Sequence, residues 1–178
     1  MKYDELPIGP QAPEIVTVVV EIPQGSSNKI EYDITTEVFR LDRVLYSPLH
    51  YPCEYGFIPH TLFEDGDPVD ILVLASKPTF TGCVLPVRPV GVLHMSDDKG
   101  QDHKILGVSA HDPRYENVLS LEHVYEHRLK EINHFFNVYK DLEDKEVDVL
   151  GWQDTAAAHR LIQMYRTDGG AALPNVRS

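Results

Sequence analysis

The sequence predicts an α+β protein, with a closed or partly closed β-sheet and helices packed outside it. Short apolar or alternating segments separated by turn residues fill most of the chain, and helical periodicity begins only near Leu121. The 178 residues are 42% hydrophobic and 25% charged, which is ordinary for a globular protein. We therefore expect residues 1–178 to form a single domain.

Strand patterns begin soon after the amino terminus. An irregular, Pro-rich lead covers residues 1–13, and residues 15–22 are rich in Val and Ile. Charged and apolar residues alternate over 29–34 and again over 38–43, so each charged set shares one face of a strand. Taken alone, the alternation favours a solvated face for three of these residues, namely Lys29, Glu31 and Arg43.

A dense acidic turn lies at the centre of the stretch 51–74. Its four carboxylates are Glu64, Asp65, Asp67 and Asp70. Gly66 and Pro68 favour a tight turn, and the apolar run 71–74 predicts a buried strand after it. Carboxylates this close repel one another, so a cation is expected, and oxygen ligands are typical of Mg²⁺, Mn²⁺ or Ca²⁺. The alternative is an exposed turn that binds nothing.

Further strands and then helices follow. Residues 84–95 predict a strand, which Pro86 and Pro89 mark as an edge strand or a bulged one. Residues 97–104 predict a hairpin-like turn with a second acidic cluster, and residues 105–108 resume as a strand.

The helical part begins with a clear apolar periodicity over 125–140. A second helix should start at Asp154 or Thr155 and end at Gly169 and Gly170. Its apolar stripe contains Ala158, Leu161, Ile162 and Tyr165. We expect a loose tail over about 168–178.

Composition limits the partners and the compartment. A formal net charge of -12 disfavours nonspecific binding to nucleic acid or to an anionic membrane. No segment reaches membrane-spanning length. Cys53 and Cys83 have neither metal-ligand spacing nor the number needed for a disulfide framework, so a reducing compartment is expected. The start resembles neither a signal nor a transit peptide, which favours the cytoplasm; a presequence already removed would allow an organelle.

Two acidic turns together with scattered Lys, Arg and Tyr residues suggest a site where metals meet phosphate. Divalent ions held by carboxylates can clamp the attacking and leaving oxygens of a phosphoryl group, while basic and phenolic groups hold the other oxygens. Rival patterns fit poorly: an EF-hand would need an oxygen ligand where Val69 stands. The Asp-x-Asp-x-Val pattern of haloacid-dehalogenase-type phosphatases lacks its preceding strand, and a nucleic-acid-binding OB-fold conflicts with the charge.

Several motifs, in order, resemble the soluble family I inorganic pyrophosphatases. The central one is Glu-Asp-Gly-Asp-Pro-Val-Asp at 64–70, and Tyr-Pro-Cys-Glu-Tyr-Gly-Phe-Ile at 51–58 precedes it. Val-Glu-Ile-Pro at 20–23, Arg-Pro-Val-Gly-Val at 88–92 and His-Phe-Phe-Asn-Val-Tyr-Lys-Asp-Leu-Glu at 134–143 also match. The resemblance implies an OB-like five-stranded β-barrel core with flanking C-terminal helices, and hydrolysis of pyrophosphate to two phosphates with several Mg²⁺ ions, Mn²⁺ being a substitute.

The resemblance also implies a role for each matching residue. Asp67 would be the general base in direct attack by a metal-activated hydroxide. The metal ligands would be Asp65, Asp70, Asp97, Asp102 and Glu31. Substrate would be bound by Lys29, Arg43, Tyr55, Lys104, Tyr139 and Lys140. Supporting positions would be Glu21 and Tyr51. The alternation of Lys29, Glu31 and Arg43 is then interpreted as one face turned into the barrel mouth.

One position departs from the family pattern, because Asp98 stands where a Glu is usual, and we expect it to support the site without binding metal. The length resembles the prokaryotic-type enzymes, which implies a homo-oligomer, with a hexamer favoured. A catalytically silent phosphate- or metal-binding module of the same fold is the alternative function.

Overall fold

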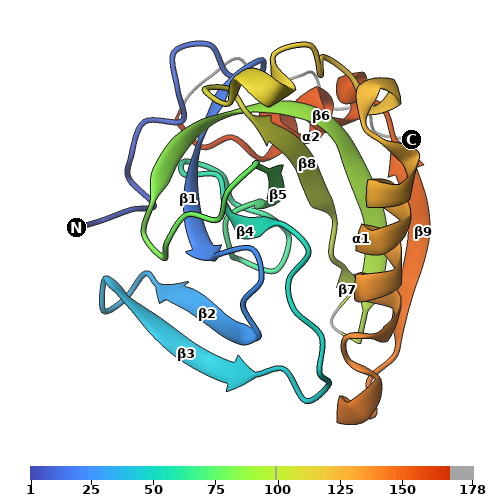
Figure 1. Ribbon diagram of the computed structural model, residues 1–178. Helices are drawn as coiled ribbons and strands as arrows, with labels where there is room; N and C mark the ends of the chain where they lie inside the picture. Colours follow the sequence, from blue (N-terminus) through green and yellow to red (C-terminus); the bar gives the residue numbers. More distant parts are fainter. Residues whose placement is uncertain (99, 169–178) are drawn as a thin grey trace, which may run out of the picture.

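The computed structural model describes residues 1–98 and 100–168, and a closed ring of five strands forms its centre (Figure 1). In order around the ring the strands are β1 (Val16–Ile22), β4 (Glu54–Phe57), β5 (Asp70–Leu74), β8 (Lys104–Ser109) and β6 (Val84–Asp97). Pairing of β6 with β1 closes the ring. All the pairs are antiparallel except β5 with β8. The predicted α+β class with a five-stranded barrel is confirmed.

The remaining elements lie around this barrel. They are the strands β2 (Asn28–Asp33), β3 (Val38–Val44), β7 (Gly100–Gln101) and β9 (Val147–Gln153), the helices α1 (Glu126–Val138) and α2 (Thr155–Tyr165), and the short 3-10 segments Pro113–Tyr115, Leu121–His123 and Asp141–Glu143. The β2–β3 hairpin forms a sheet of its own, and β9 pairs with the second half of β6 beside α1 (Figure 1).

Apolar packing covers both faces of the strand that follows the acidic turn. Along β5, Leu72 and Leu74 join the core cluster that contains the buried residues of α1. Ile71 and Val73 join the cluster that contains the buried residues of α2. Because each face has its own apolar partners, the strand is an unbroken apolar run and not an alternating one.

The strand β6 departs from one of its two predicted forms. It pairs with neighbours on both sides, so it is not an edge strand. The predicted bulge is present, since the register against β8 shifts between Pro89 and Gly91. The expected order of strands first and helices afterwards is also wrong, because β9 lies between the two helices.

The helices agree with their predicted positions. Helix α1 falls within the expected 125–140. Helix α2 is capped by Asp154, whose side chain accepts a hydrogen bond from the amide of Ala157 at 2.9 Å. It ends at Tyr165, before the expected glycines, and Gly169, Gly170 and the tail to 178 lie outside the described residues.

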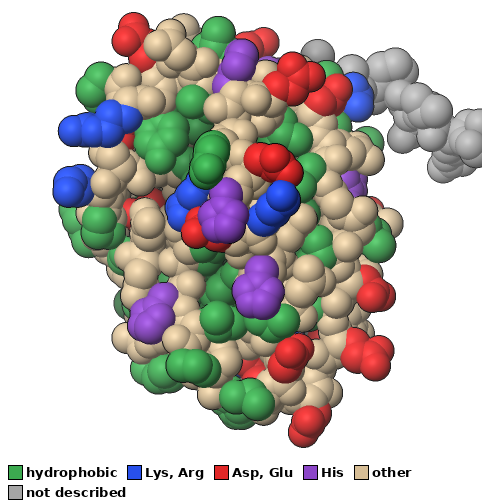
Figure 2. Space-filling view, turned by 45° about the vertical axis from the view of Figure 1, so that its right-hand side comes forward, with side chains coloured by type: hydrophobic (Ala, Val, Ile, Leu, Met, Phe, Trp, Pro, Cys, Tyr) green, Lys and Arg blue, Asp and Glu red, His purple; other side chains and the backbone are tan. Residues whose placement is uncertain are grey.

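The outer surface shows no single dominant charge on the side that carries α1. Within the described part of the chain, basic side chains on this face are interspersed with acidic, histidine and apolar ones and form no continuous patch (Figure 2). Neither of the two described helices has the length and apolar character needed to cross a membrane.

Candidate active site

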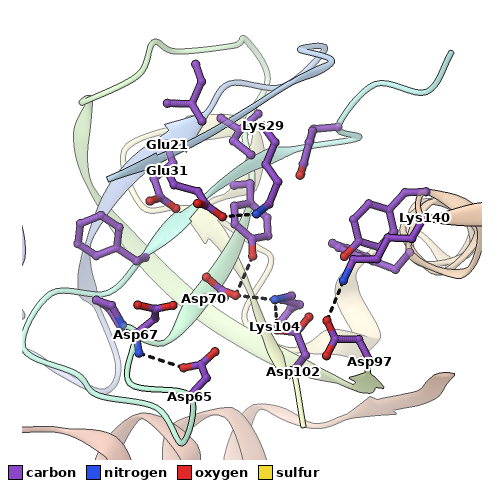
Figure 3. Close-up of a pocket in the computed structure, with 18 of the residues that line it drawn as sticks. Glu21, Lys29, Glu31, Asp65, Asp67, Asp70, Asp97, Asp102, Lys104 and Lys140 are labelled. Carbon is purple, nitrogen blue, oxygen red and sulfur yellow. Dashed lines mark hydrogen bonds and ion pairs between the residues drawn. The ribbon is translucent and has the colours of Figure 1, made fainter. Parts of the chain in front are cut away.

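All the predicted site residues line one cavity of about 230 Å³ (Figure 3). The residues that share this lining are Glu21, Lys29, Glu31, Arg43, Tyr51, Tyr55, Asp65, Asp67, Asp70, Asp97, Asp102, Lys104, Tyr139 and Lys140. They come from β1, the β2–β3 hairpin, the stretch 51–70, the β6–β7 hairpin with the start of β8, and the end of α1. The fold therefore gathers residues that are more than 100 positions apart in sequence.

The acidic turn has the predicted tight conformation. The amide of Asp67 donates to Asp65 Oδ1 at 3.0 Å, and the amide of Phe63 donates to the carbonyl of Asp67 at 2.7 Å. Gly66 adopts a φ of +92°, which a residue with a side chain rarely adopts. Asp70 is the first residue of β5, so the end of the turn is fixed to the barrel wall. Asp65, Asp67 and Asp70 line the cavity (Figure 3), whereas Glu64 lies outside its lining and accepts a hydrogen bond from the Tyr165 hydroxyl at 2.7 Å.

A buried lysine sits among the carboxylates at the cavity floor. Lys104, with a side chain only 3% exposed, contacts Asp70 at 2.5 Å and also forms an ion pair with Asp102. Tyr55 donates its hydroxyl to the same Asp70 oxygen at 2.7 Å. Burial alone would lower the pKa of Lys104, but the two carboxylates raise it above its ordinary value. Lys104 thus supplies a cation from within the chain for Asp70, the last carboxylate of the acidic turn, and for Asp102 of the second acidic cluster.

Burial changes the ionisation of the acids and phenols that line this floor. It raises the pKa of Asp70 despite the neighbouring Lys104, and it raises the pKa of Tyr55 well above its ordinary value. It also raises the pKa of Glu21 to about 8, although Glu21 accepts a hydrogen bond from the amide of Tyr32 at 2.7 Å. Bringing charge into this part of the cavity has a large desolvation cost.

The remaining cations reach the cavity already paired. Lys140, at the end of α1, contacts Asp97 at 2.7 Å (Figure 3). Lys29 forms an ion pair with Glu31. Arg43 contacts Asp42 Oδ2 at 2.5 Å through Nη1. Each amine or guanidinium therefore has an anionic partner, which an incoming phosphate would have to displace or share.

The aromatic side chains of the site form one packed group. The ring of Tyr51 lies 5.6 Å from that of Tyr55 and 4.9 Å from that of Phe135, measured between centroids. Tyr139 stacks on Phe135 at 5.3 Å. Phe135 of α1 thus packs against Tyr51, and Tyr51 in turn packs against Tyr55.

The donor set fits a hard divalent cation in its chemistry. Within residues 1–98 and 100–168, no three acidic, His or Cys side chains stand close enough together to hold an ion as they are placed. Lysines are paired with Asp70, Asp97 and Asp102. Nevertheless, six Asp carboxylates line the one cavity, and the residues that line it include neither His nor Cys. Oxygen-only ligation of this kind suits Mg²⁺ or Mn²⁺ once the lysines shift.

Some residues of the site were not predicted. Lys145 lines the cavity, and Asp42 and Glu143 hold Arg43 from outside the lining set. Asp98, expected to support the site without binding metal, also lines the cavity. Glu143 ends the matching stretch 134–143, which is the one sequence signal that pointed to it. Cys53 is fully buried outside the cavity lining, and burial raises the pKa of its thiol to about 12.

An OB-like barrel with an acidic, lysine-rich cavity at its mouth defines a class of protein suited to holding divalent cations beside a phosphate anion. The family model described as inorganic pyrophosphatase matches residues 18–168. The chain belongs to the inorganic pyrophosphatase family.

Relatives of known name agree with this assignment over most of the chain. The inorganic pyrophosphatase of Methanosarcina mazei is 53% identical over 150 residues, covering 84% of this chain and 89% of the relative. That of Synechocystis is 48% identical over 163 residues, covering 92% and 96%. The crystal structure of the Thermus thermophilus inorganic pyrophosphatase superposes with a TM-score of 0.89 at 46% identity, covering 92% of this chain and 95% of that one.

Proposed function

We propose that this chain hydrolyses inorganic pyrophosphate to two orthophosphates with the help of several Mg²⁺ ions. Family membership supports the reaction. The observation that carries the site assignment is that every predicted carboxylate, amine, guanidinium and phenol lines the same cavity. A barrel that had kept its fold but lost its chemistry would not be expected to retain all of them together.

The carboxylates divide into two proposed roles. Asp65, Asp70 and Asp102 would hold metal, Asp97 would share an ion with Asp102, and Glu31 would bind metal that arrives with substrate. Bound Mg²⁺ supplies charge neutralisation of phosphate oxygens and a lowered pKa for coordinated water. These oxygen ligands fit that ion, and they also fit Mn²⁺.

Asp67 is the proposed general base. Its position is set by the hydrogen bond from its amide to Asp65, one of the proposed metal ligands. A carboxylate beside the metals can accept the proton of the attacking water, so phosphorus is attacked directly and no covalent intermediate forms.

Cationic and phenolic groups on the other walls would bind the phosphate oxygens. They are Lys29, Arg43, Tyr55, Lys104, Tyr139 and Lys140. Lys104 and Lys140 are buried, so each would give up part of its contact with an Asp when metal and substrate enter, the metal taking the carboxylate and the amine taking phosphate. Glu21 and Tyr51 would support this arrangement from behind.

A phosphate-release assay tests the reaction. Pyrophosphate, nucleotides and organic phosphate esters are offered in parallel with Mg²⁺, Mn²⁺ or Ca²⁺, and each with excess EDTA. We expect turnover of pyrophosphate with Mg²⁺ and, less efficiently, with Mn²⁺, and none with EDTA. If phosphate is released from pyrophosphate no faster than in the blank with every metal, the proposal is overturned. If an organic ester is hydrolysed faster than pyrophosphate, that ester and not pyrophosphate is the substrate.

We also propose that residues 1–178 act as one domain in a cytoplasmic homo-oligomer, with a hexamer favoured by the resemblance to prokaryotic-type enzymes. Light scattering during size-exclusion chromatography measures the molar mass directly. A monomer at micromolar concentration would contradict the oligomer.

A further inference from the structure

The Arg43 guanidinium is held by a carboxylate from the far side of the cavity. Arg43 Nε donates to Glu143 Oε1 at 2.9 Å, although the two residues are 100 positions apart. Nη1 of the same guanidinium donates to Asp42 at 2.5 Å. Two of its three nitrogens are therefore fixed by carboxylates, and Nη2 is left for a ligand, since no partner for it exists among residues 1–98 and 100–168.

Glu143 is placed to orient Arg43 and not to meet substrate itself. Its side chain is only 7% exposed, that of Arg43 is 21% exposed, and Glu143 does not belong to the set of described residues lining the cavity. It occupies the 3-10 segment Asp141–Glu143 directly after Lys140. Glu143 also lies 3.9 Å from the amine of Lys145, which lines the cavity, but its shorter contact is with Arg43. A side chain that is buried, charged and paired in this way acts through its partners.

The same contact ties the β2–β3 hairpin to the rest of the molecule. Near the turn that joins its two strands, the hairpin packs on the barrel through a cluster containing Tyr32, Phe39 and Phe57. The end of the hairpin that carries Arg43 lies at the other side of the cavity mouth, where the ion pair with Glu143 joins it to the 3-10 segment after α1. The contact therefore fixes both the direction of one side chain and the position of a strand that carries it.

We infer that Glu143 is a positioning residue that sets the affinity for the phosphate substrate by fixing Arg43. The inference rests on the proposed function, because it assigns Arg43 to substrate. A direct electrostatic action of Glu143 would have the opposite sign: removing a negative charge near an anion site strengthens anion binding by Coulomb's law. Positioning of Arg43 requires instead that removing Glu143 weakens substrate binding.

Steady-state kinetics on pyrophosphate with Mg²⁺ separate these accounts. In Glu143→Ala we expect KM to rise about tenfold, equivalent to roughly 1.4 kcal/mol, with kcat changed less than about threefold. Glu143→Gln keeps an acceptor oxygen for Nε, so KM should rise less, by about threefold. The matched control is Asp141→Asn, an exposed carboxylate in the same 3-10 segment, which should leave both constants unchanged.

A double-mutant cycle tests whether Glu143 acts through Arg43. Adding Glu143→Ala to Arg43→Ala should change KM by less than about twofold, because the group to be positioned is already absent. A KM for Glu143→Ala equal to or below the wild-type value, or a further full tenfold rise in the double variant, overturns the inference.

Far-UV circular dichroism of each variant at the assay temperature verifies folding. If Glu143→Ala does not fold, Glu143→Gln, alone and combined with Arg43→Ala, provides the same test. If the wild type fails to hydrolyse pyrophosphate, the proposed function fails instead.

Discussion

Replacing Lys104 with Met should strongly destabilise the metal-free protein. Met keeps most of the apolar stem, so the main loss is the charge that faces Asp70 and Asp102. The lysine side chain is 3% exposed, and the two carboxylates are 27% and 20% exposed. Removing one partner of a buried ion pair leaves the other charge uncompensated, so we expect the free energy of unfolding to fall by about 4 kcal/mol.

Urea unfolding in EDTA measures this loss, followed by the fluorescence of Trp152, the only tryptophan. With a slope of about 2 kcal/mol per molar urea, the midpoint should fall by about 2 M. Mg²⁺ should restore part of the loss, because the same two carboxylates are the proposed metal ligands; an ion at 100 times its dissociation constant adds about 2.7 kcal/mol. The raised pKa of Lys104 means that its contribution is complete below its unfolded pKa of 10.5 and is lost as the pH rises through the folded value.

The matched control is Lys130→Met on α1. That lysine pairs with Glu126 at 2.7 Å, but the two side chains are 66% and 80% exposed, so the change should stay below about 0.5 kcal/mol. A midpoint for Lys104→Met within about 0.5 M of the wild type in EDTA would refute the role of Lys104 as the internal cation. A lowered midpoint that Mg²⁺ does not raise would remove these carboxylates from the proposed metal site.

Three further predictions test other parts of the molecule. Asp67→Asn should lower kcat by at least about a hundredfold with little change in KM, as expected for loss of a general base; unchanged turnover would exclude that role. Glu54 is fully buried and accepts from Thr79 N at 2.8 Å, and burial raises its pKa, so its ionisation opposes folding as the pH rises above 4.5. In urea titrations, the free energy of unfolding of Glu54→Gln relative to that of the wild type should therefore increase as the pH rises above 4.5. A difference that does not change with pH would contradict this. Asp154→Ala should cost about 1 kcal/mol by removing the cap of α2, whereas Asp154→Asn should cost less, as thermal unfolding would show.

Elements with a clear period were predictable from the sequence alone. The alternation at 29–34 and 38–43 became β2 and β3, and the apolar run after the acidic turn became β5. The short strand β4 was missed because Gly56 interrupts its pattern. A Cβ at Gly56 would stand 1.9 Å from the carbonyl oxygen of Val19, so only glycine allows β1 and β4 to approach this closely.

Elements that depend on tertiary contacts were not predictable. Strand β9 contains Gly151 and the exposed Leu150, and it is held by its pairing with β6 and not by its own pattern. The β5–β8 parallel pairing has no local signal, since it depends on how the ring closes. The matching stretch 134–143 includes Glu143 but gave no sign of its role, because its partner is 100 positions away. The site residues were identified by resemblance, and only the acidic turns stood out by composition.

The separate β2–β3 hairpin has a consequence for the solubility of the protein. Each of its strands pairs only with the other among the described residues. The amide of Tyr32 on β2 donates to Glu21 of the barrel, whereas β3 presents an edge without a further strand, of the kind that recruits other strands and starts aggregation. Its exposed apolar side chains, such as Leu41 and Val44, add to this hazard. Charged residues interrupt them along both strands, including Arg40 and Asp42. Substitutions that remove these charged side chains from the hairpin can therefore lower the yield of soluble protein before they change any rate.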